Sequence, residues 1–545
     1  MDITIIQDGT LVYGKSFAKG AHATVDDATG SALIASFLAV PANRRIPSDA
    51  EIALMGSASV LRNASGSSTG IKDPASGRPA SAGLAARIKA ALASAAARNP
   101  IGKAPWIAAP AWQASTAYAL PGTCVQNGGN EYQLYIAGTS ASSGGPTGTA
   151  DTPVTDGTCS WVYRGPAMTA SATPVAPTVS WVTDKGGLTT LVRWDTAGAY
   201  FYSGGYVAPK YTSSRCNLPS AYKAPTTGNA DGGSSPYVDY DQNFGTVNFW
   251  SDAPLICLNG GVSGMTNCGF VVEVDGQYLQ PGSIPVASAG GNVGMLINWG
   301  FRKPRRYRVW FSPALFWQGV YTTSKDSVWA DVPENSFRIV INGDSLTQGG
   351  GVTPHQGQDW PSQFAYHIGC RDIYNCAVGG TGFISNNGGA ATTFAQRLPD
   401  VINWQPDVHI IAGNHNDSGY TNSAQQAAIV SYLQQFRAGC PNAWILCFGP
   451  WAEQSGPSAA MIAAEANMQA AVATFNDPLC FFLPAIGDSP TWVTGTGSTK
   501  SPTGTGNSDV MTDGSTQQGI HPTQRGIDYL ALRYARSWRN FWVAR

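Results

Sequence analysis

The pattern of hydrophobic and polar positions separates a strand-rich first part of the 545-residue chain from a last part in which strands and helices alternate. From residue 338 onward, apolar runs of four or five residues alternate with longer stretches of helical periodicity. We expect strands at 338–341, 372–375, 408–412, 444–448 and 480–483, and helices near 360–368, 424–437, 459–473 and 522–542. This alternation is typical of a three-layer α/β sandwich around a parallel sheet.

Residues 170–330 have a different pattern, with many short strands separated by Gly, Asn and Asp turns. The runs 189–194, 269–276 and 305–311 are examples, and the Asp275-Gly276 pair is a hairpin signal. This spacing predicts an all-β sandwich. Near the N-terminus, an alternating run at 3–12 favours a strand and an alanine-rich run at 84–92 favours a helix.

These shifts divide the chain into four expected parts, and its length is sufficient for three or four domains that each bury a core. Residues 1–104 form an irregular N-terminal region, 105–168 a small β module, 169–333 the β-sandwich, and 334–545 the α/β domain.

Composition narrows the class of function. Charged residues make up only 12% of the chain, about half the usual share, while it has 63 Gly, 35 Pro and 17 Trp. This profile is typical of turn-rich β proteins that act on sugars outside cells. A net charge of −1 gives no electrostatic reason to expect binding to nucleic acid or to an anionic membrane. No apolar run approaches the ~20 residues of a membrane-spanning helix, and the N-terminus lacks the pattern of a secretory signal.

The ten cysteines leave two interpretations open. The pairs Cys124 with Cys159, Cys257 with Cys268, and Cys370 with Cys376 could form disulfides, or the thiols could be free and buried. No Cys-x-x-Cys motif and no histidine pair with ligand spacing occurs, so we expect no metal site.

The candidate chemistry begins where the strand at 338–341 runs into Gly343-Asp344-Ser345. A tight turn there lifts a serine hydroxyl to the carboxyl edge of the sheet, where open α/β folds bind ligands. Serine becomes a good nucleophile only when a base takes its proton, and His521 near the C-terminus is the candidate base. Segments 377–382 and 412–417 are candidates for oxyanion donors.

These four segments, in this order, resemble the conserved blocks of the SGNH (GDSL) hydrolase family. The resemblance implies that Ser345 is the nucleophile and His521 the general base. It also implies that the backbone N–H of Gly380 and the side-chain amide of Asn416 bind the oxyanion. Such a hydrolase needs no metal and no organic cofactor.

One position departs from the family, which usually has an aspartate three residues before the histidine. This chain has Gln518 there, so the carboxylate expected to orient His521 is missing. Gln518 itself, a backbone carbonyl, Asp513 or Asp509 are the alternatives that remain open.

The loop 487–518 is long and rich in Gly, Ser and Thr, and it leads directly to the candidate base. A loop of this length in a compact domain usually has a function. We therefore expect it to border the site, with Trp492 in contact with substrate.

The parts before the α/β domain also show resemblances. Residues 105–167 resemble a small chitin-binding-type carbohydrate module, and the sandwich resembles the N-terminal jelly roll of two-domain carbohydrate esterases. Residues 1–104 faintly resemble attachment regions of bacteriophage tail proteins. Aromatic rings suit the apolar face of a sugar, but a module this small also needs aromatics in its own core. The candidate sugar-binding residues are Trp112, Tyr118, Tyr132 and Trp161.

Together these resemblances predict a serine carbohydrate O-acetylesterase that acts on an acetylated polysaccharide, such as a bacterial surface glycan, as a phage tail or tailspike component. One alternative is a general esterase or lipase of the same fold. Another is a glycan- or receptor-binding virion protein with an inactive hydrolase domain, which Gln518 keeps open. We expect action outside the cell, from a virion or after secretion. The expected partners are the glycan and other virion proteins or copies of the chain, without nucleic acid or membrane.

Overall fold

The structure is a computed structural model, and it is described here for a defined set of residues. These are 2–5, 10–12, 15–17, 22–24, 39–41, 84–96, 109–118, 123–149, 153–167, 177–182, 184–196, 198–203, 208–210, 212–217, 246–263, 269–279, 284–285, 290–300, 302, 304–311, 315–331, 337–349, 357, 359–389, 392–451, 453, 456–494 and 519–545. No helix among them is long and apolar enough to cross a membrane.

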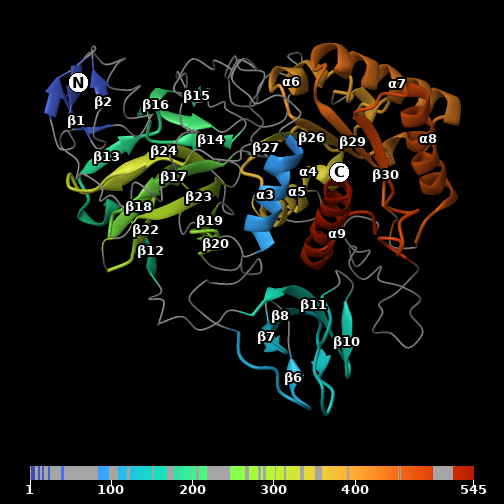
Figure 1. The fold of residues 1–545 in the computed structure, drawn as a ribbon, viewed down its shortest axis with the longest axis horizontal. Helices are drawn as coiled ribbons and strands as arrows, with labels where there is room; N and C mark the ends of the chain where they lie inside the picture. Colours follow the sequence, from blue (N-terminus) through green and yellow to red (C-terminus); the bar gives the residue numbers. More distant parts are fainter. Residues whose placement is uncertain are drawn as a thin grey trace.

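The C-terminal part contains a five-stranded parallel sheet in the order β27-β26-β28-β29-β30 (Figure 1). Its strands are β26 (Arg338–Gly343), β27 (Asp372–Asn375), β28 (Val408–Ala412), β29 (Trp444–Phe448) and β30 (Cys480–Leu483). Its helices are α4 (Ser345–Gln348), α5 (Trp360–Ile368), α6 (Leu398–Asn403), α7 (Asn422–Gly439), α8 (Ala459–Phe475) and α9 (Gln524–Val543). The expected parallel α/β architecture is therefore confirmed.

The sheet has a hydrophobic core on each face because successive strand residues point to opposite sides. Ile339 and Ile341 pack with helices α5 and α9, whereas Val340 packs on the other face with α7 and α8. The strands are buried on both faces, which is why they appear in the sequence as short continuous apolar runs.

A helix from far upstream completes one of these layers. Helix α3 (Leu84–Ala96) lies beside α5 and α9 in Figure 1. Its residues Leu84, Ile88 and Leu92 belong to the same core as Trp538 of α9. Arg87 adds an ion pair of 3.5 Å to Asp407, just before β28. Residues 84–96 therefore pack as part of the α/β layers, although the small β module and the β-sandwich separate them from the α/β domain in the sequence.

The β-sandwich between these parts consists of two antiparallel sheets that share one core. The first sheet contains β12 (Thr178–Val182), β13 (Thr190–Arg193), β15 (Ala208–Lys210), β16 (Thr212–Asn217), β18 (Leu255–Ser263), β22 (Gly290–Asn298) and β24 (Leu315–Thr322). The second contains β14 (Phe201–Tyr202), β17 (Val247–Ser251), β19 (Gly269–Val274), β20 (Gln277–Tyr278), β21 (Ile284–Pro285), β23 (Arg305–Phe311) and β25 (Val328–Ala330). The two-sheet sandwich agrees with the sequence pattern, and its assignment as a jelly roll stays a prediction.

The small module has a four-stranded sheet in the order β10-β11-β8-β7 and a separate β6–β9 pair. The strands are β6 (Ala117–Tyr118), β7 (Cys124–Asn127), β8 (Asn130–Ile136), β9 (Gly138–Thr139), β10 (Val154–Asp156) and β11 (Cys159–Pro166). Five short strands, β1 (Asp2–Ile5), β2 (Thr10–Val12), β3 (Lys15–Phe17), β4 (His22–Thr24) and β5 (Ala39–Pro41), lie near the N-terminus.

The aromatic residues of the small module mainly build its core. Tyr132 and Trp161 are both 0% exposed, so neither presents a face to a sugar in this structure. Trp112 and Tyr118 are half-buried. The indole N–H groups of Trp112 and Trp161 both donate to the buried carboxylate of Asp156, at 2.7 and 2.9 Å. For Tyr132 and Trp161, the core role that the sequence left open is the one observed.

The cysteines in the proposed pairs are not bonded to each other. Cys124, Cys159, Cys257, Cys370 and Cys376 are all free thiols. Cys124 lies on β7 and Cys159 on β11, which are separated in the sheet by β8. The free-thiol interpretation therefore holds for Cys124 with Cys159, where Cys124 is half-buried, and for Cys370 with Cys376. Cys257 is also a free thiol, and its proposed partner Cys268 lies outside the described residues.

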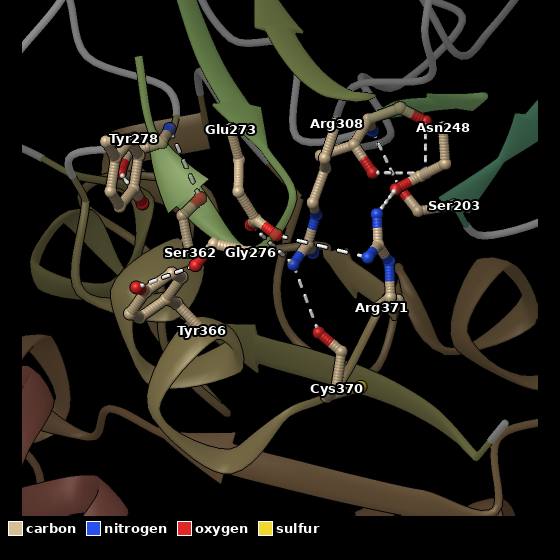
Figure 2. A network of polar contacts seen from close by, with 12 residues as sticks. Ser203, Asn248, Glu273, Gly276, Tyr278, Arg308, Ser362, Tyr366, Cys370 and Arg371 are labelled. Atoms are coloured by element: carbon tan, nitrogen blue, oxygen red, sulfur yellow. Dashed lines mark hydrogen bonds and ion pairs between the residues drawn. The ribbon is translucent and has the colours of Figure 1, made fainter. Parts of the chain in front are cut away.

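A buried polar cluster joins the sandwich to the α/β domain (Figure 2). Arg371, which precedes β27, pairs with Asp331 at 2.7 Å and lies 3.9 Å from Glu273, and both acids belong to the sandwich. In the opposite direction, Arg308 of β23 donates to the carbonyl of Cys370 at 3.2 Å. All of these side chains are nearly inaccessible to solvent. The cluster is therefore stable only while each buried charge has a partner of opposite charge.

Two tyrosines add reciprocal contacts across the same interface. The Tyr366 hydroxyl of α5 donates to the carbonyl of Gly276 in the β19–β20 turn at 3.0 Å (Figure 2). The Tyr278 hydroxyl of β20 donates at 3.0 Å to the carbonyl of Gly357, which lies between α4 and α5. The hairpin predicted from Asp275-Gly276 therefore docks directly on the α/β domain.

We expect Arg371→Ala to lower the free energy of unfolding by about 1–3 kcal/mol, because it removes one of the two cations beside each of the buried carboxylates of Asp331 and Glu273 and leaves them with Arg306 and Arg308. Arg193→Ala is the control, since the Arg193–Asp195 pair is largely exposed and should contribute less than about 1 kcal/mol. Denaturant titration of both variants measures the difference. Equal small losses would show that the interface does not depend on Arg371.

Candidate active site

The candidate nucleophile lies at the carboxyl end of the central part of the sheet. Strand β26 ends at Gly343, Asp344 caps the short helix α4, and Ser345 is the first residue of that helix. A Cβ on Gly343 would lie 2.2 Å from the carbonyl oxygen of Ala412 and 2.5 Å from Thr347 Oγ1, so only glycine fits there. The N–H of Ser345 belongs to the first turn of a helix, where N–H groups have no intrahelical acceptor.

The candidate base meets this serine across 176 residues of sequence. His521 Nε2 lies 2.9 Å from Ser345 Oγ, within direct hydrogen-bond reach. His521 is held by the start of α9, whose N-cap residue Thr523 accepts a hydrogen bond from the N–H of Gly526. This is the geometry in which an imidazole can take the serine proton as the oxygen attacks.

The surroundings of His521 favour its neutral form. Burial lowers the pKa of His521 below its ordinary value, and the charge of neighbouring His415 lowers it further. Its other nitrogen, Nδ1, is buried and has no hydrogen-bond partner within the residues that the structure describes. The three candidates for orienting the imidazole, Gln518, Asp513 and Asp509, lie outside the described residues, and their roles stay predictions.

The first expected oxyanion donor lies on the loop after β27. Gly380 has a left-handed backbone with φ of 72°. The preceding residue, Gly379, passes so close to the nucleophile that a Cβ on it would lie 3.3 Å from the Cβ of Ser345. The N–H of Gly379 is already engaged with Gln348 Oε1. The loop thus brings Gly380 close to Ser345 while the N–H of Gly379 is committed elsewhere.

The second expected donor follows β28 on a short turn. Asn416 is half-buried, and its side-chain amide donates one hydrogen to the carbonyl of Thr381 at 2.9 Å. An amide group has two N–H donors, so a second remains for a substrate oxygen. Asn414 is different, because it is fully buried and its amide donates to the carbonyl of Ala464. Asn416 rather than Asn414 therefore adjoins the Gly380 loop.

Two buried carboxylates that the sequence analysis did not single out hold these segments in place. Asp417 accepts backbone N–H groups of Phe383 and Ser385 at 2.7 and 2.8 Å, and thereby fixes the end of the Gly380 loop. Asp344 accepts the N–H of Leu346 at 3.0 Å. Burial raises the pKa of Asp344 to about 6, while the charge of His415 and hydrogen bonding oppose the rise.

Trp492 does not line the site. It is 0% exposed and belongs to the core around α9. Its indole N–H donates to Asp488 at 2.7 Å, and its ring packs edge-on against Tyr534. The expectation that Trp492 contacts substrate is therefore replaced by a structural role. The sequence had no signal for this, because an apolar ring in a polar loop suits either position.

We predict that the acid limb of the kcat/KM profile on a small acetyl ester lies below pH 6.5. The reason is that the lowered pKa of His521 keeps the imidazole neutral, and able to accept a proton, to a lower pH than an ordinary histidine. Folding must be monitored at each pH so that unfolding is not mistaken for titration. A limb at or above pH 6.5 would contradict the desolvated base.

Asn416→Ala should lower kcat by roughly 10²–10³, the usual cost of losing one preorganised oxyanion donor. Asn414→Gly is the matched control, because Asn414 has φ of 92° and glycine adopts this conformation without strain. Steady-state kinetics on one ester would compare them. A larger loss in Asn414→Gly would mean that the wrong asparagine has been assigned.

The chain has distant likenesses among solved protein structures. No curated protein matches the sequence. Among solved structures, a salicylyl-acyltransferase, SsfX3, from a tetracycline biosynthetic pathway has a TM-score of 0.45 at 12% identity, covering 65% of this chain and 98% of its own. A family two carbohydrate esterase from Cellvibrio japonicus has 0.44 at 12% identity, covering 67% and 99%. An acetyl xylan esterase (Est2A) from Butyrivibrio proteoclasticus has 0.40 at 14%, covering 63% and 99%.

The family comparison is specific to the segment that contains the site. Residues 341–528 match the GDSL-like Lipase/Acylhydrolase family, and this range includes Ser345, Gly380, Asn416 and His521. The C-terminal part of this chain therefore contains a GDSL/SGNH hydrolase domain.

Proposed function

We propose that this protein is a serine O-acetylesterase that removes acetyl groups from a polysaccharide. The observation that supports it most directly is the 2.9 Å contact between Ser345 Oγ and His521 Nε2 at the carboxyl edge of the sheet. A hydrolase domain of this family with its serine and histidine in contact is suited to ester cleavage without a cofactor.

In the proposed reaction, His521 accepts the proton of Ser345 as the serine oxygen attacks the acetyl carbonyl. The tetrahedral oxyanion accepts hydrogen bonds from the N–H groups of Gly380 and Ser345 and from the free N–H of Asn416. His521 then gives the proton to the departing sugar oxygen, which leaves an acetyl-serine. A water molecule, deprotonated by His521, attacks this ester, and His521 returns the proton to the Ser345 oxygen as acetate leaves.

The choice of a glycan rather than a lipid rests on the surface and on the flanking parts. Among the described residues, the exposed large hydrophobic side chains are Tyr420, Ile462 and Val543. They are single residues on separate segments and do not form the apolar surface that a long acyl chain would need. The resemblance of the preceding parts to carbohydrate-directed modules favours a polysaccharide, and a role in a phage tail is part of this proposal.

A general esterase or lipase is the alternative within the same chemistry. A glycan-binding virion protein with a disabled hydrolase domain is the alternative from another class. Gln518 in place of the family aspartate is the feature that favours the second alternative.

Ser345→Ala should abolish acetate release from acetylated bacterial polysaccharides, because no other group would attack the ester. The wild type should release acetate from at least one member of a panel, and should cleave short acetyl esters faster than long-chain esters. Circular dichroism would confirm that the variant is folded. Turnover that persists in Ser345→Ala would exclude the serine mechanism.

Gln518→Asp distinguishes an active enzyme from a disabled one. If the wild type is active and Gln518 orients His521, the added carboxylate should raise kcat, since it stabilises the imidazolium that forms during the reaction. A wild type that is inert on every ester, together with an active Gln518→Asp variant, would instead indicate a binding protein on a hydrolase scaffold.

A further inference from the structure

A fully buried arginine lies directly behind the candidate site. Arg397 is 0% exposed and immediately precedes α6. Its Nη2 donates to Asn342 Oδ1 at 2.9 Å and to the carbonyl of Gly343 at 3.0 Å, both at the end of β26. Its Nη1 donates to Thr381 Oγ1 at 3.1 Å and to the carbonyl of Thr392. One guanidinium therefore spans two segments of the site.

Thr381 is the link from this arginine to the oxyanion donors. Its hydroxyl accepts from Arg397 and donates to the carbonyl of Val378 at 2.6 Å, which closes the loop around Gly380. Its own carbonyl accepts the amide of Asn416. Gly380 directly precedes Thr381, and Asn416 is hydrogen-bonded to it. Arg397 therefore holds the residue to which both expected donors are attached.

The other end of the guanidinium holds the nucleophile turn. The carbonyl of Gly343 accepts from Arg397 and also from the N–H of Val378 at 3.2 Å. Gly343 is two residues before Ser345. The carbonyl of Gly343 therefore helps to set the distance between Ser345 and the Gly380 loop, because it accepts hydrogen bonds from both Arg397 and Val378.

We propose that Arg397 is a positioning residue that fixes the oxyanion donors relative to Ser345. This inference rests on the proposed esterase function. Burying a cation costs free energy that an apolar side chain would not, so stability alone does not explain an arginine here. The planar fork of arginine can bond two segments at once, and lysine offers only a compact point charge. Misplacement of a reacting group by 1 Å can cost about 10² in rate.

The test compares Arg397→Lys with Arg338→Lys on a small acetyl ester. Arg338 is the matched control, because it is also buried but lies at the opposite end of the same strand, away from Ser345. There it donates to Asp372 at 2.9 Å and to the carbonyl of Trp404 at 2.8 Å. We expect both variants to lose stability. Only Arg397→Lys should lose kcat, by about 10–100-fold with KM within about threefold, at a temperature where both are folded.

A double variant separates positioning from general weakening. If Arg397 acts through the oxyanion donors, kcat of Arg397→Lys/Asn416→Ala should fall by clearly less than the product of the two single effects. Thr381→Ser, which keeps the hydroxyl, should retain more of kcat than Thr381→Val.

Three results would overturn the inference: multiplicative effects in the double variant, equal effects in the two lysine variants, or equal effects in the two Thr381 variants. Each is interpretable only against an active wild type and an inactive Ser345→Ala. An inert wild type would refute the proposed function itself, so the two failures are distinguishable.

Discussion

The close approach of two strand ends at Gly343 is the constraint on which the site depends. There the backbone of β26 runs so near the carbonyl of Ala412, at the end of β28, that no side chain fits. The turn that follows carries Ser345, and the segment after β28 carries Asn416. Because the two strands are parallel and in fixed register, closing this gap brings the candidate nucleophile and a candidate oxyanion donor to the same edge without any long side chain reaching across.

The parts that precede the hydrolase domain are built into it rather than attached loosely. Helix α5 follows the nucleophile segment and is contacted from both directions, by α3 through apolar side chains and by the sandwich through the hydroxyl of Tyr366. The adjoining buried cluster adds a charged contact, because Arg371 pairs with Asp331 and Glu273 of the sandwich, which also have Arg306 and Arg308 as partners on their own side. The sandwich therefore acts as a support for the layer of helices that faces the catalytic strand.

The local features of the α/β domain were predictable from sequence because they depend on near neighbours. The apolar runs gave β27, β28, β29 and β30 with their observed bounds, and the Gly-Asp-Ser turn placed Ser345 directly after β26, where the structure has it. Features set by distant packing were not predictable. Trp492 was expected to contact substrate because its loop leads to His521, but the core around α9 encloses it. Arg397 gave no signal, since three of its four hydrogen-bond partners, Thr381, Gly343 and Asn342, lie 16, 54 and 55 residues away.

The electrostatics of the site explain how a Ser–His pair can work where the usual aspartate is replaced by Gln518. Burial lowers the pKa of His521, so forming its imidazolium is costly, and no carboxylate at the family position offsets that cost. The imidazolium forms at the same moment as the oxyanion, however, and opposite charges attract more strongly in a site with little water. The more firmly the oxyanion is held, the less the imidazolium needs a partner of its own. The buried carboxylate of Asp417, which fixes the Gly380 loop through the N–H groups of Phe383 and Ser385, therefore bears on the base as well. A rigid oxyanion site therefore offsets part of the cost of the missing aspartate.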